Sequence, residues 1–273
     1  MYLDVDGGRL AYEVTGSGPL VVLAHGIGDS RAAYRFVAPA LAEAGYRVAA
    51  VDLRGTGESS ATWPEYSRTA IAGDLLALVR HLGGPAVLVG HSISGGAVTI
   101  AAATEPGLVT ALVQVAPFTR AQSFRFADLF HGPYRRGVWN LAGAMLGRLS
   151  AWRRYLEHAY PGPRPADWSS RLDRIEAMLR EPGRTAALQQ MLRTSPADAG
   201  EHLAGVRCPV LVIEGSLDPD WVDPGAEGAA IVAALPDGLG RVEIIEGAGH
   251  YPHVQFPEQV VAAVRTHLAA IGG

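Results

Sequence analysis

A serine, an aspartate and a histidine, each placed shortly after an apolar run, could together carry out nucleophilic catalysis. They are Ser92, Asp218 and His250. A serine hydroxyl is a poor nucleophile near neutral pH, so it needs a base, and an imidazole oriented by a carboxylate can serve as one. If the apolar runs are parallel strands, all three side chains emerge at the same edge of one sheet. The sequence therefore predicts a triad that activates Ser92 for attack on an acyl carbon.

The residues around Ser92 are typical of a sharp turn between a strand and a helix. Such a turn needs small residues two positions before and after the serine, and Gly90 and Ser94 occupy these positions. Ser94 departs from the usual G-x-S-x-G pattern, and an ordinary Gly-rich turn with Ser92 capping a helix is the alternative. His91 is expected to be structural, because chain neighbours at such a turn point apart. The Ile93 N–H, at the start of the helix, can donate to an oxyanion.

Two further Gly-rich turns accompany the expected site. The first contains His25, Gly26 and Ile27, and it can direct the Ile27 N–H toward the same anion. The second, 52–59, contains an isolated G-x-G, which is weak evidence for a phosphate site because this turn is the wrong place for a dinucleotide-binding motif. We interpret it as a structural turn in which Arg54 bonds to carbonyls or to a carboxylate.

The acid and the base have rival interpretations. Asp218 precedes a proline, as ordinary turn residues do, and Asp220 and Asp223 are alternative carboxylates. His250 and His253 could form an H-x-x-H metal pair, but the proline between them disrupts a shared helix face and no third ligand is evident. We therefore expect no metal and no cofactor.

The apolar runs that precede these residues lack strict alternation, which is typical of strands buried on both faces of a parallel sheet. Segments with helical spacing lie between most of them, and this alternation predicts an α/β doubly wound sheet. A hairpin of 2–6 and 10–14, joined by Gly7-Gly8, is expected at one edge. The other expected strands are 20–24, 48–51, 86–89, 111–115, 210–213 and 242–245, and the expected helices are 31–44, 68–82, 92–104, 225–235 and 257–271.

One interval lacks buried strand runs. Residues 118–203 instead show helical spacing interrupted by prolines, which predicts a helical cap inserted into a core of residues 1–117 and 204–273. The interval carries 13 arginines and eight acidic residues, whereas the remainder carries 10 and 19. The cap is therefore basic, and its arginine pairs at 135–136 and 153–154 either form a solvated face or favour anionic substrates.

Composition excludes several classes of function. The 273 residues, 48% of them hydrophobic, suffice for a large core and exclude disorder. All 23 basic residues are arginines, so chemistry that needs a lysine Schiff base or a P-loop lysine is excluded. The net charge of −4 argues against nucleic acid, and Cys208, the single cysteine, is expected in the core. Without a visible signal peptide or membrane-spanning run, we expect a cytoplasmic protein with no membrane partner.

The chain resembles the α/β-hydrolase superfamily along nearly its whole length. The motifs that carry the resemblance stand in family order and spacing: HGIGDS at 25–30, DLRGTGESS at 52–60, GHSISGG at 90–96, EGSLDP at 214–219 and GAGHYPHVQFPEQV at 247–260. The resemblance implies Ser92 as nucleophile, Asp218 as triad acid, His250 as base, and the Ile27 and Ile93 N–H groups as oxyanion donors. It also implies an α/β-hydrolase fold, a mostly parallel sheet of about eight strands with an inserted helical cap.

We therefore predict a serine hydrolase that cleaves an ester or similar acyl bond of a small molecule through an acyl-enzyme intermediate. Epoxide hydrolases and haloalkane dehalogenases of this superfamily need an aspartate at the position of Ser92, which argues against both. A carbon–carbon bond hydrolase or a cofactor-free perhydrolase would use the same triad. A ligand-binding signalling hydrolase with slow turnover is the third alternative, because some signalling relatives also have serine at the position of Ser94.

Overall fold

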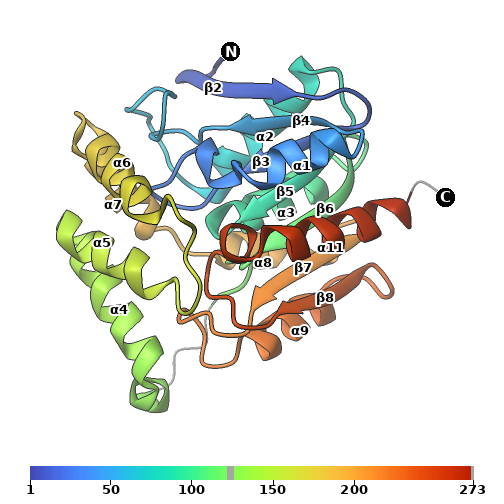
Figure 1. Cartoon of the computed structure of the whole chain (residues 1–273). Helices are drawn as coiled ribbons and strands as arrows, with labels where there is room; N and C mark the ends of the chain where they lie inside the picture. The colour runs from blue at the N-terminus through green and yellow to red at the C-terminus, as the bar shows by residue number, and fades with distance from the viewer. Residues whose placement is uncertain (122–125, 272–273) are drawn as a thin grey trace.

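An eight-stranded sheet forms the centre of the described part of the chain (Figure 1). The computed structural model describes residues 1–121 and 126–271. The strand order is β1-β2-β4-β3-β5-β6-β7-β8; β1 pairs antiparallel with β2 and β2 with β4, and the other neighbours are parallel. This arrangement confirms the predicted α/β-hydrolase fold. The strands are β1 (Tyr2–Val5), β2 (Gly8–Thr15), β3 (Leu20–Ala24), β4 (Arg47–Val51), β5 (Ala86–His91), β6 (Val109–Val115), β7 (Val210–Gly215) and β8 (Gly240–Ile245).

Helices cover both faces of the sheet, which explains the continuous apolar sequence of the central strands. Every residue of β3, β5 and β7 is buried. On one face, side chains of α2 (Arg68–His81), α3 (Ile93–Thr104) and α9 (Pro224–Ala234) pack onto the strands. On the other face, α1 (Val37–Glu43) and α11 (Pro257–Ala269) do so, and Figure 1 shows these two helices in front of the sheet.

The hairpin and the first helix differ in detail from their predictions. The two-residue loop of the hairpin is Asp6-Gly7, and the left-handed φ of 86° at Gly7 suits its second position. The segment 31–44 begins with a short 3-10 turn, η1 (Arg31–Tyr34), and only then continues as α1. Pro39 accounts for this late start, because proline lacks an N–H donor and is tolerated in the first turn of a helix but not in its interior.

Between β6 and β7 the described residues form helices and no strand. Figure 1 shows α4 to α7 grouped at one side of the sheet, whereas α8 contacts α2 and α3. Residues 122–125 of the predicted cap lie outside the described residues. None of the described helices of the chain is long and apolar enough to cross a membrane. The elements of this interval are η2 (Phe126–Phe130), α4 (Gly132–Met145), α5 (Leu149–His158), α6 (Trp168–Arg180), α7 (Arg184–Leu192), α8 (Ala197–His202) and η3 (Leu203–Gly205).

Ion pairs and an aromatic cluster attach these helices to the sheet and its loops. Arg171, in α6, forms a buried ion pair with Asp29, in the loop after β3. Arg35 donates two hydrogen bonds of 2.7 Å to the carboxylate of Asp167, just before α6. An apolar cluster built mainly from α5 and α6 extends to Tyr251, in the loop after β8. The helices therefore share packing with a loop that carries a candidate site residue.

Candidate active site

Ser92 lies on a strained turn between β5 and α3. Its backbone angles are φ 55° and ψ −120°, which residues with a Cβ rarely adopt and which the surrounding structure must enforce. A Cβ on Gly90 would collide with the carbonyl oxygen of Ser94, so this position requires glycine. The Ser92 N–H donates to the Val115 carbonyl at 3.0 Å, and the Ser92 carbonyl accepts from the Phe118 N–H at 3.1 Å. The turn therefore presents Ser92 at the carboxyl end of β5.

The neighbours of Ser92 make contacts that hold this turn in place. The Ser94 hydroxyl donates to the His25 carbonyl at 2.6 Å, which joins the first turn of α3 to the loop after β3. His91 donates from Nε2 to the His250 carbonyl at 2.8 Å. Burial lowers the pKa of His91 well below its usual value. This neutral ring ties the turn to the loop of His250, in line with the structural role expected of it.

The two candidate oxyanion donors have no hydrogen-bond acceptor within the described residues. Ile93 is the first residue of α3, where the N–H groups of a helix lack intrahelical partners. Neither its N–H nor that of Ile27 donates to another described residue, and both residues line the same pocket as Ser92. An oxyanion formed there can meet two backbone donors and the positive end of the α3 dipole.

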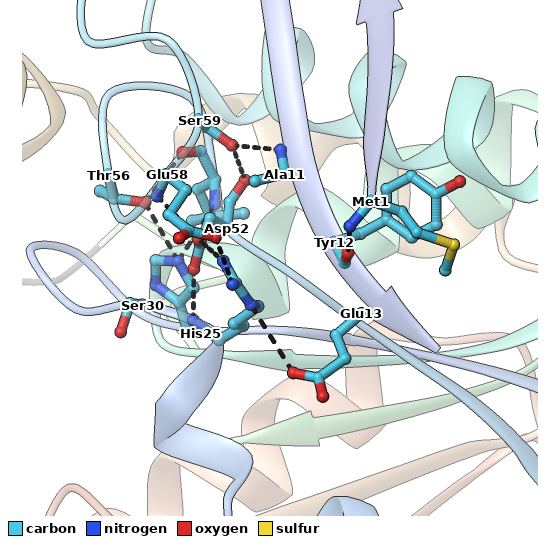
Figure 2. A network of polar contacts seen from close by, with 12 residues as sticks. Met1, Ala11, Tyr12, Glu13, His25, Ser30, Asp52, Thr56, Glu58 and Ser59 are labelled. Atoms are coloured by element: carbon cyan, nitrogen blue, oxygen red, sulfur yellow. Dashed lines mark hydrogen bonds and ion pairs between the residues drawn. The ribbon is translucent and has the colours of Figure 1, made fainter. Parts of the chain in front are cut away.

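A polar network holds the loop that carries Ile27 (Figure 2). His25 donates from Nδ1 to the Gly26 carbonyl at 2.7 Å and accepts at Nε2 from the Leu53 N–H at 3.1 Å. Burial lowers the pKa of His25, which keeps this ring neutral in that tautomer. A Cβ on Gly26 would approach His91 Nδ1 to 2.7 Å. The loop therefore passes directly against the turn of Ser92, and a larger residue at position 26 would separate the two.

The motif at 52–60 belongs to the same network. Asp52 is fully buried and accepts two backbone N–H groups, one of them from Glu58 at 2.9 Å (Figure 2). A Cβ on Gly57 would collide with the Asp52 carboxylate, which explains the second glycine of the G-x-G. Arg54 forms two hydrogen bonds of 2.8 Å with Asp74. These contacts confirm the prediction of a structural turn whose arginine bonds to a carboxylate.

Asp218 bonds to His250 more closely than its rivals do. A carboxylate oxygen of Asp218 lies 2.7 Å from His250 Nδ1, and an oxygen of Asp220 lies 3.4 Å from the same atom. Asp223 instead caps α9 by accepting a backbone N–H at 2.9 Å. The loops of Asp218 and His250 follow β7 and β8, which are parallel neighbours. Because a carboxylate only accepts, Nδ1 carries the hydrogen and Nε2 is left for the pocket.

Two buried carboxylates control the charge of His250. Burial favours the neutral ring, but the negative charges of Asp218 and Asp220, together with the hydrogen bond to Asp218, raise the pKa of His250 to about 9. Burial raises the pKa of Asp220 to about 6, although the charge of His250 opposes the shift. Tyr155, in α5, donates to Asp220 at 2.6 Å. Tyr155 was not predicted as a site residue, because no sequence motif connects it to a carboxylate 65 positions away.

Ser92 and His250 line a pocket of about 170 Å³, smaller than the roughly 300–1,000 Å³ of most ligand pockets. No hydrogen bond joins the Ser92 hydroxyl to His250 in this structure, and such bonds are often long until substrate binds. A larger groove of about 790 Å³, lined partly by Arg136, Arg154 and Arg164, contains neither residue. The smaller pocket is lined by Ile27, Arg68, Ser92, Ile93, Phe118, Leu141, Met145, Trp152, Tyr155, Met191, Leu192, Thr194, Pro196, Asp220, His250 and Tyr251.

Within residues 1–121 and 126–271, one group of three side chains is close enough together to hold a metal ion. It consists of Asp218, Asp220 and His250. His250 Nδ1 lies 2.7 Å from an oxygen of Asp218 and 3.4 Å from one of Asp220, and it is already occupied as a hydrogen-bond donor to Asp218. His253 does not belong to the group, and its ring lies 4.6 Å from that of His91. The geometry thus favours an acid–base pair over the H-x-x-H arrangement.

Comparison with known proteins identifies the family. The model of the alpha/beta hydrolase family matches residues 21–264. An uncharacterized protein of Mycobacterium tuberculosis is 31% identical, over 97% of this chain and 79% of its own. The 2-(acetamidomethylene)succinate hydrolase of Mesorhizobium japonicum is 29% identical, over 97% and 94%. An esterase from Rhodococcus sp. superposes with a TM-score of 0.79 at 27% identity, over 99% and 98% of the two chains. These matches show that the chain belongs to the alpha/beta hydrolase family, and the strand order and the turn at Ser92 agree with this assignment.

Proposed function

We propose that this protein is a serine hydrolase that cleaves an ester or similar acyl bond of a small molecule. The observation that carries the proposal is the arrangement around one pocket: Ser92 on its strained turn, two backbone N–H groups without an acceptor among the described residues, and His250 bonded to Asp218. Each part has one task in acyl transfer, namely attack, stabilisation of the oxyanion and proton transfer. Family membership supports hydrolysis as the reaction class.

In the first half of the proposed reaction, the Ser92 hydroxyl oxygen attacks the acyl carbon while His250 Nε2 takes its proton. The carbonyl oxygen becomes an oxyanion that accepts hydrogen bonds from the N–H groups of Ile27 and Ile93. Asp218 stabilises the positive imidazolium through its bond to Nδ1. The tetrahedral intermediate then collapses, the bond to the leaving group breaks, and the leaving alcohol receives the proton from His250.

In the second half, a water molecule replaces the alcohol. His250, again neutral, takes a proton from the water as its oxygen attacks the acyl-enzyme carbon. Collapse of the second intermediate returns the proton to the Ser92 oxygen and releases the carboxylic acid. The small pocket favours a short acyl chain. The hydrolase and the esterase among the relatives named above are consistent with acyl-bond cleavage.

Covalent labelling and burst kinetics test this proposal together. A fluorophosphonate probe should label Ser92 alone, as read by mass spectrometry of the labelled peptide, and 4-nitrophenyl acetate should give a burst of one equivalent of nitrophenolate. Ser92→Ala should abolish the label and lower turnover by a factor on the order of 10³ to 10⁶. Ser94→Ala is the matched control, because it removes the neighbouring hydroxyl and should keep the label.

The identity of the triad acid is tested by exchanging carboxylates for amides. Asp218→Asn should lower kcat by up to about 10⁴-fold, because the amide favours the wrong imidazole tautomer, whereas Asp223→Asn should leave kcat unchanged. Full activity of Asp218→Asn would transfer the role to Asp220. A wild-type protein that takes the label but turns over no ester, while binding a small ligand tightly, would contradict the enzyme and support the signalling alternative.

A further inference from the structure

Arg68 is a buried cation in the candidate active-site pocket, and the reaction proposed above gives it no task. It is 3% exposed and lines the pocket together with Ser92 and His250. Its Nε donates to the Phe118 carbonyl at 3.1 Å and its Nη1 to the Thr194 hydroxyl at 3.0 Å. Both acceptors are uncharged. A guanidinium has five N–H donors, so most of its hydrogen-bonding capacity remains for another group.

Arg68 differs from the other buried arginines in its lack of an ion pair with a described carboxylate. Arg54, Arg171 and Arg184 each form an ion pair with a carboxylate. Arg68, the most buried of the four, forms none with the residues that the structure describes. A buried charge without a directly bonded counter-charge is unfavourable. Burial lowers the pKa of Arg68 to about 10, although the negative charge of Asp198, which forms no ion pair with it, opposes the shift. The position at the start of α2 adds to this cost, because a helix N-terminus disfavours cations.

The backbone of α3 leaves room for this side chain. A Cβ on Gly96 would lie 2.6 Å from Arg68 Cδ and 2.9 Å from Nε. Gly96 follows Ser92 by four residues, which is about one helical turn of 5.4 Å. The Arg68 side chain therefore crosses α3 one turn away from the nucleophile. The acidic lining residue of the pocket, Asp220, already accepts from Tyr155 and contacts His250.

We propose that Arg68 binds a carboxylate of the substrate, so that the preferred substrates are short esters whose acyl part ends in a second, free carboxylate. This inference rests on the proposed function and extends it to a substrate class. The substrate carboxylate supplies a directly bonded counter-charge, which Asp198 does not provide, through charge-assisted hydrogen bonds from the guanidinium. The arginine pairs at 135–136 and 153–154 have no part in this recognition.

Matched substrates test the inference. Monoethyl glutarate and ethyl pentanoate have five-carbon acyl chains and the same leaving group, and ethanol release measures both. The wild type should hydrolyse monoethyl glutarate with a kcat/KM about 10- to 100-fold higher, the usual effect of a hydrogen bond to a charged group. Arg68→Met should lose this preference, so that the ratio of kcat/KM for monoethyl glutarate to that for ethyl pentanoate falls to about one. Equal kcat/KM for the two esters in the wild type would overturn the inference.

Thr194→Val separates recognition from support of the cap, because it removes one partner of Arg68 but keeps the guanidinium. It should retain the preference for monoethyl glutarate, and loss of the preference in this variant would contradict direct recognition.

A binding measurement is independent of turnover. Glutarate, but not glutaramide, should raise the Tm of Ser92→Ala, and Arg68→Met in that background should abolish the shift. If neither ester is cleaved, the proposed function fails, and this Tm shift still decides the role of Arg68.

Discussion

At the residue scale, the two carboxylates around His250 should determine the pH at which the enzyme works. The base form of His250 is the neutral ring, and the raised pKa of about 9 means that most of it is protonated at pH 7. Deprotonation, and therefore activity, increases as pH rises toward that value. Asp220 contributes to the shift although it is not the residue bonded to Nδ1 at 2.7 Å.

Kinetics as a function of pH check this relation. With a neutral ester, kcat/KM should rise about tenfold per pH unit from pH 7 and level off near pH 9. Asp220→Asn removes one of the charges that raise the pKa of His250, so its curve should level off at a lower pH. Asp223→Asn, which removes the same charge from the cap of α9, is the matched control and should keep the wild-type profile. An unchanged midpoint in Asp220→Asn would show that this carboxylate does not act on His250.

At the element scale, the close approach of β5 and α3 holds Ser92 in its strained conformation. Gly90 allows the approach, and the hydrogen bond from Ser94 to the His25 carbonyl joins α3 to the loop of the second oxyanion donor. The serine that departs from the usual pattern thus has a structural partner that glycine could not provide. Its loss should affect stability more than catalysis.

Two substitutions at this turn should separate stability from geometry. Ser94→Gly should lower the free energy of unfolding by about 1–2 kcal/mol, from one lost hydrogen bond and added backbone freedom, and keep kcat within a few-fold. Gly90→Ala should lower kcat by about 10²-fold or more, because its Cβ must displace α3 and the nucleophile. Gly73→Ala in α2 is the control, since a Cβ there meets no atom within 4 Å. A fully active Gly90→Ala enzyme would contradict the packing argument.

At the scale of the whole molecule, ion pairs neutralise several arginines within the helices between β6 and β7 and where these helices meet the rest of the chain. Arg153 contacts Asp173 and Glu176 at 2.8 and 3.1 Å within the helices between β6 and β7. Pairs such as Arg35 with Asp167 join these helices to the rest of the molecule. Local ion pairs therefore compensate Arg153, which favours a solvated face at that position, whereas Arg135, Arg136 and Arg154 form no ion pair with the described residues.

Buried neutral histidines should make the whole molecule sensitive to acid. Burial lowers the pKa of His253 to about 3, and neither of its ring nitrogens has a hydrogen-bond partner among the described residues. Below pH 6.5 the unfolded chain binds a proton at this residue and the folded chain does not. The free energy of unfolding therefore decreases as the pH is lowered from 6.5 to about 3. His253→Phe removes this effect. Relative to wild type, its free energy of unfolding should increase by up to about 1.4 kcal/mol for each pH unit below 6.5.

Urea unfolding between pH 6 and pH 4 measures this difference. Asp29, His91 and His250 also titrate or carry charge near His253, so the comparison is between variant and wild type at each pH. His131→Gln is the matched control, because His131 is exposed, and its curve should run parallel to that of the wild type. A parallel curve for His253→Phe as well would show that this histidine does not contribute to acid sensitivity.

The sheet and the positions of its functional loops were predictable from the amino-acid sequence. Apolar runs are a local property, and the strands they predicted, such as 20–24, agree with the structure to within a few residues. In parallel strands, residues that follow the carboxyl ends must meet at one edge of the sheet. For that reason Ser92 and His250, from runs far apart in the chain, could be placed at one site before any contact was known.

Contacts that depend on side-chain direction across large sequence separations became visible only in the folded molecule. It distinguished Asp218 from Asp220 and Asp223 by the distance of each carboxylate from His250, whereas their spacing in one short loop is equally compatible with all three. It also brought Arg68 to Thr194, 126 residues away. Such pairs carry no periodic signal, because they arise when helices dock over the sheet and bury polar groups that must then find partners.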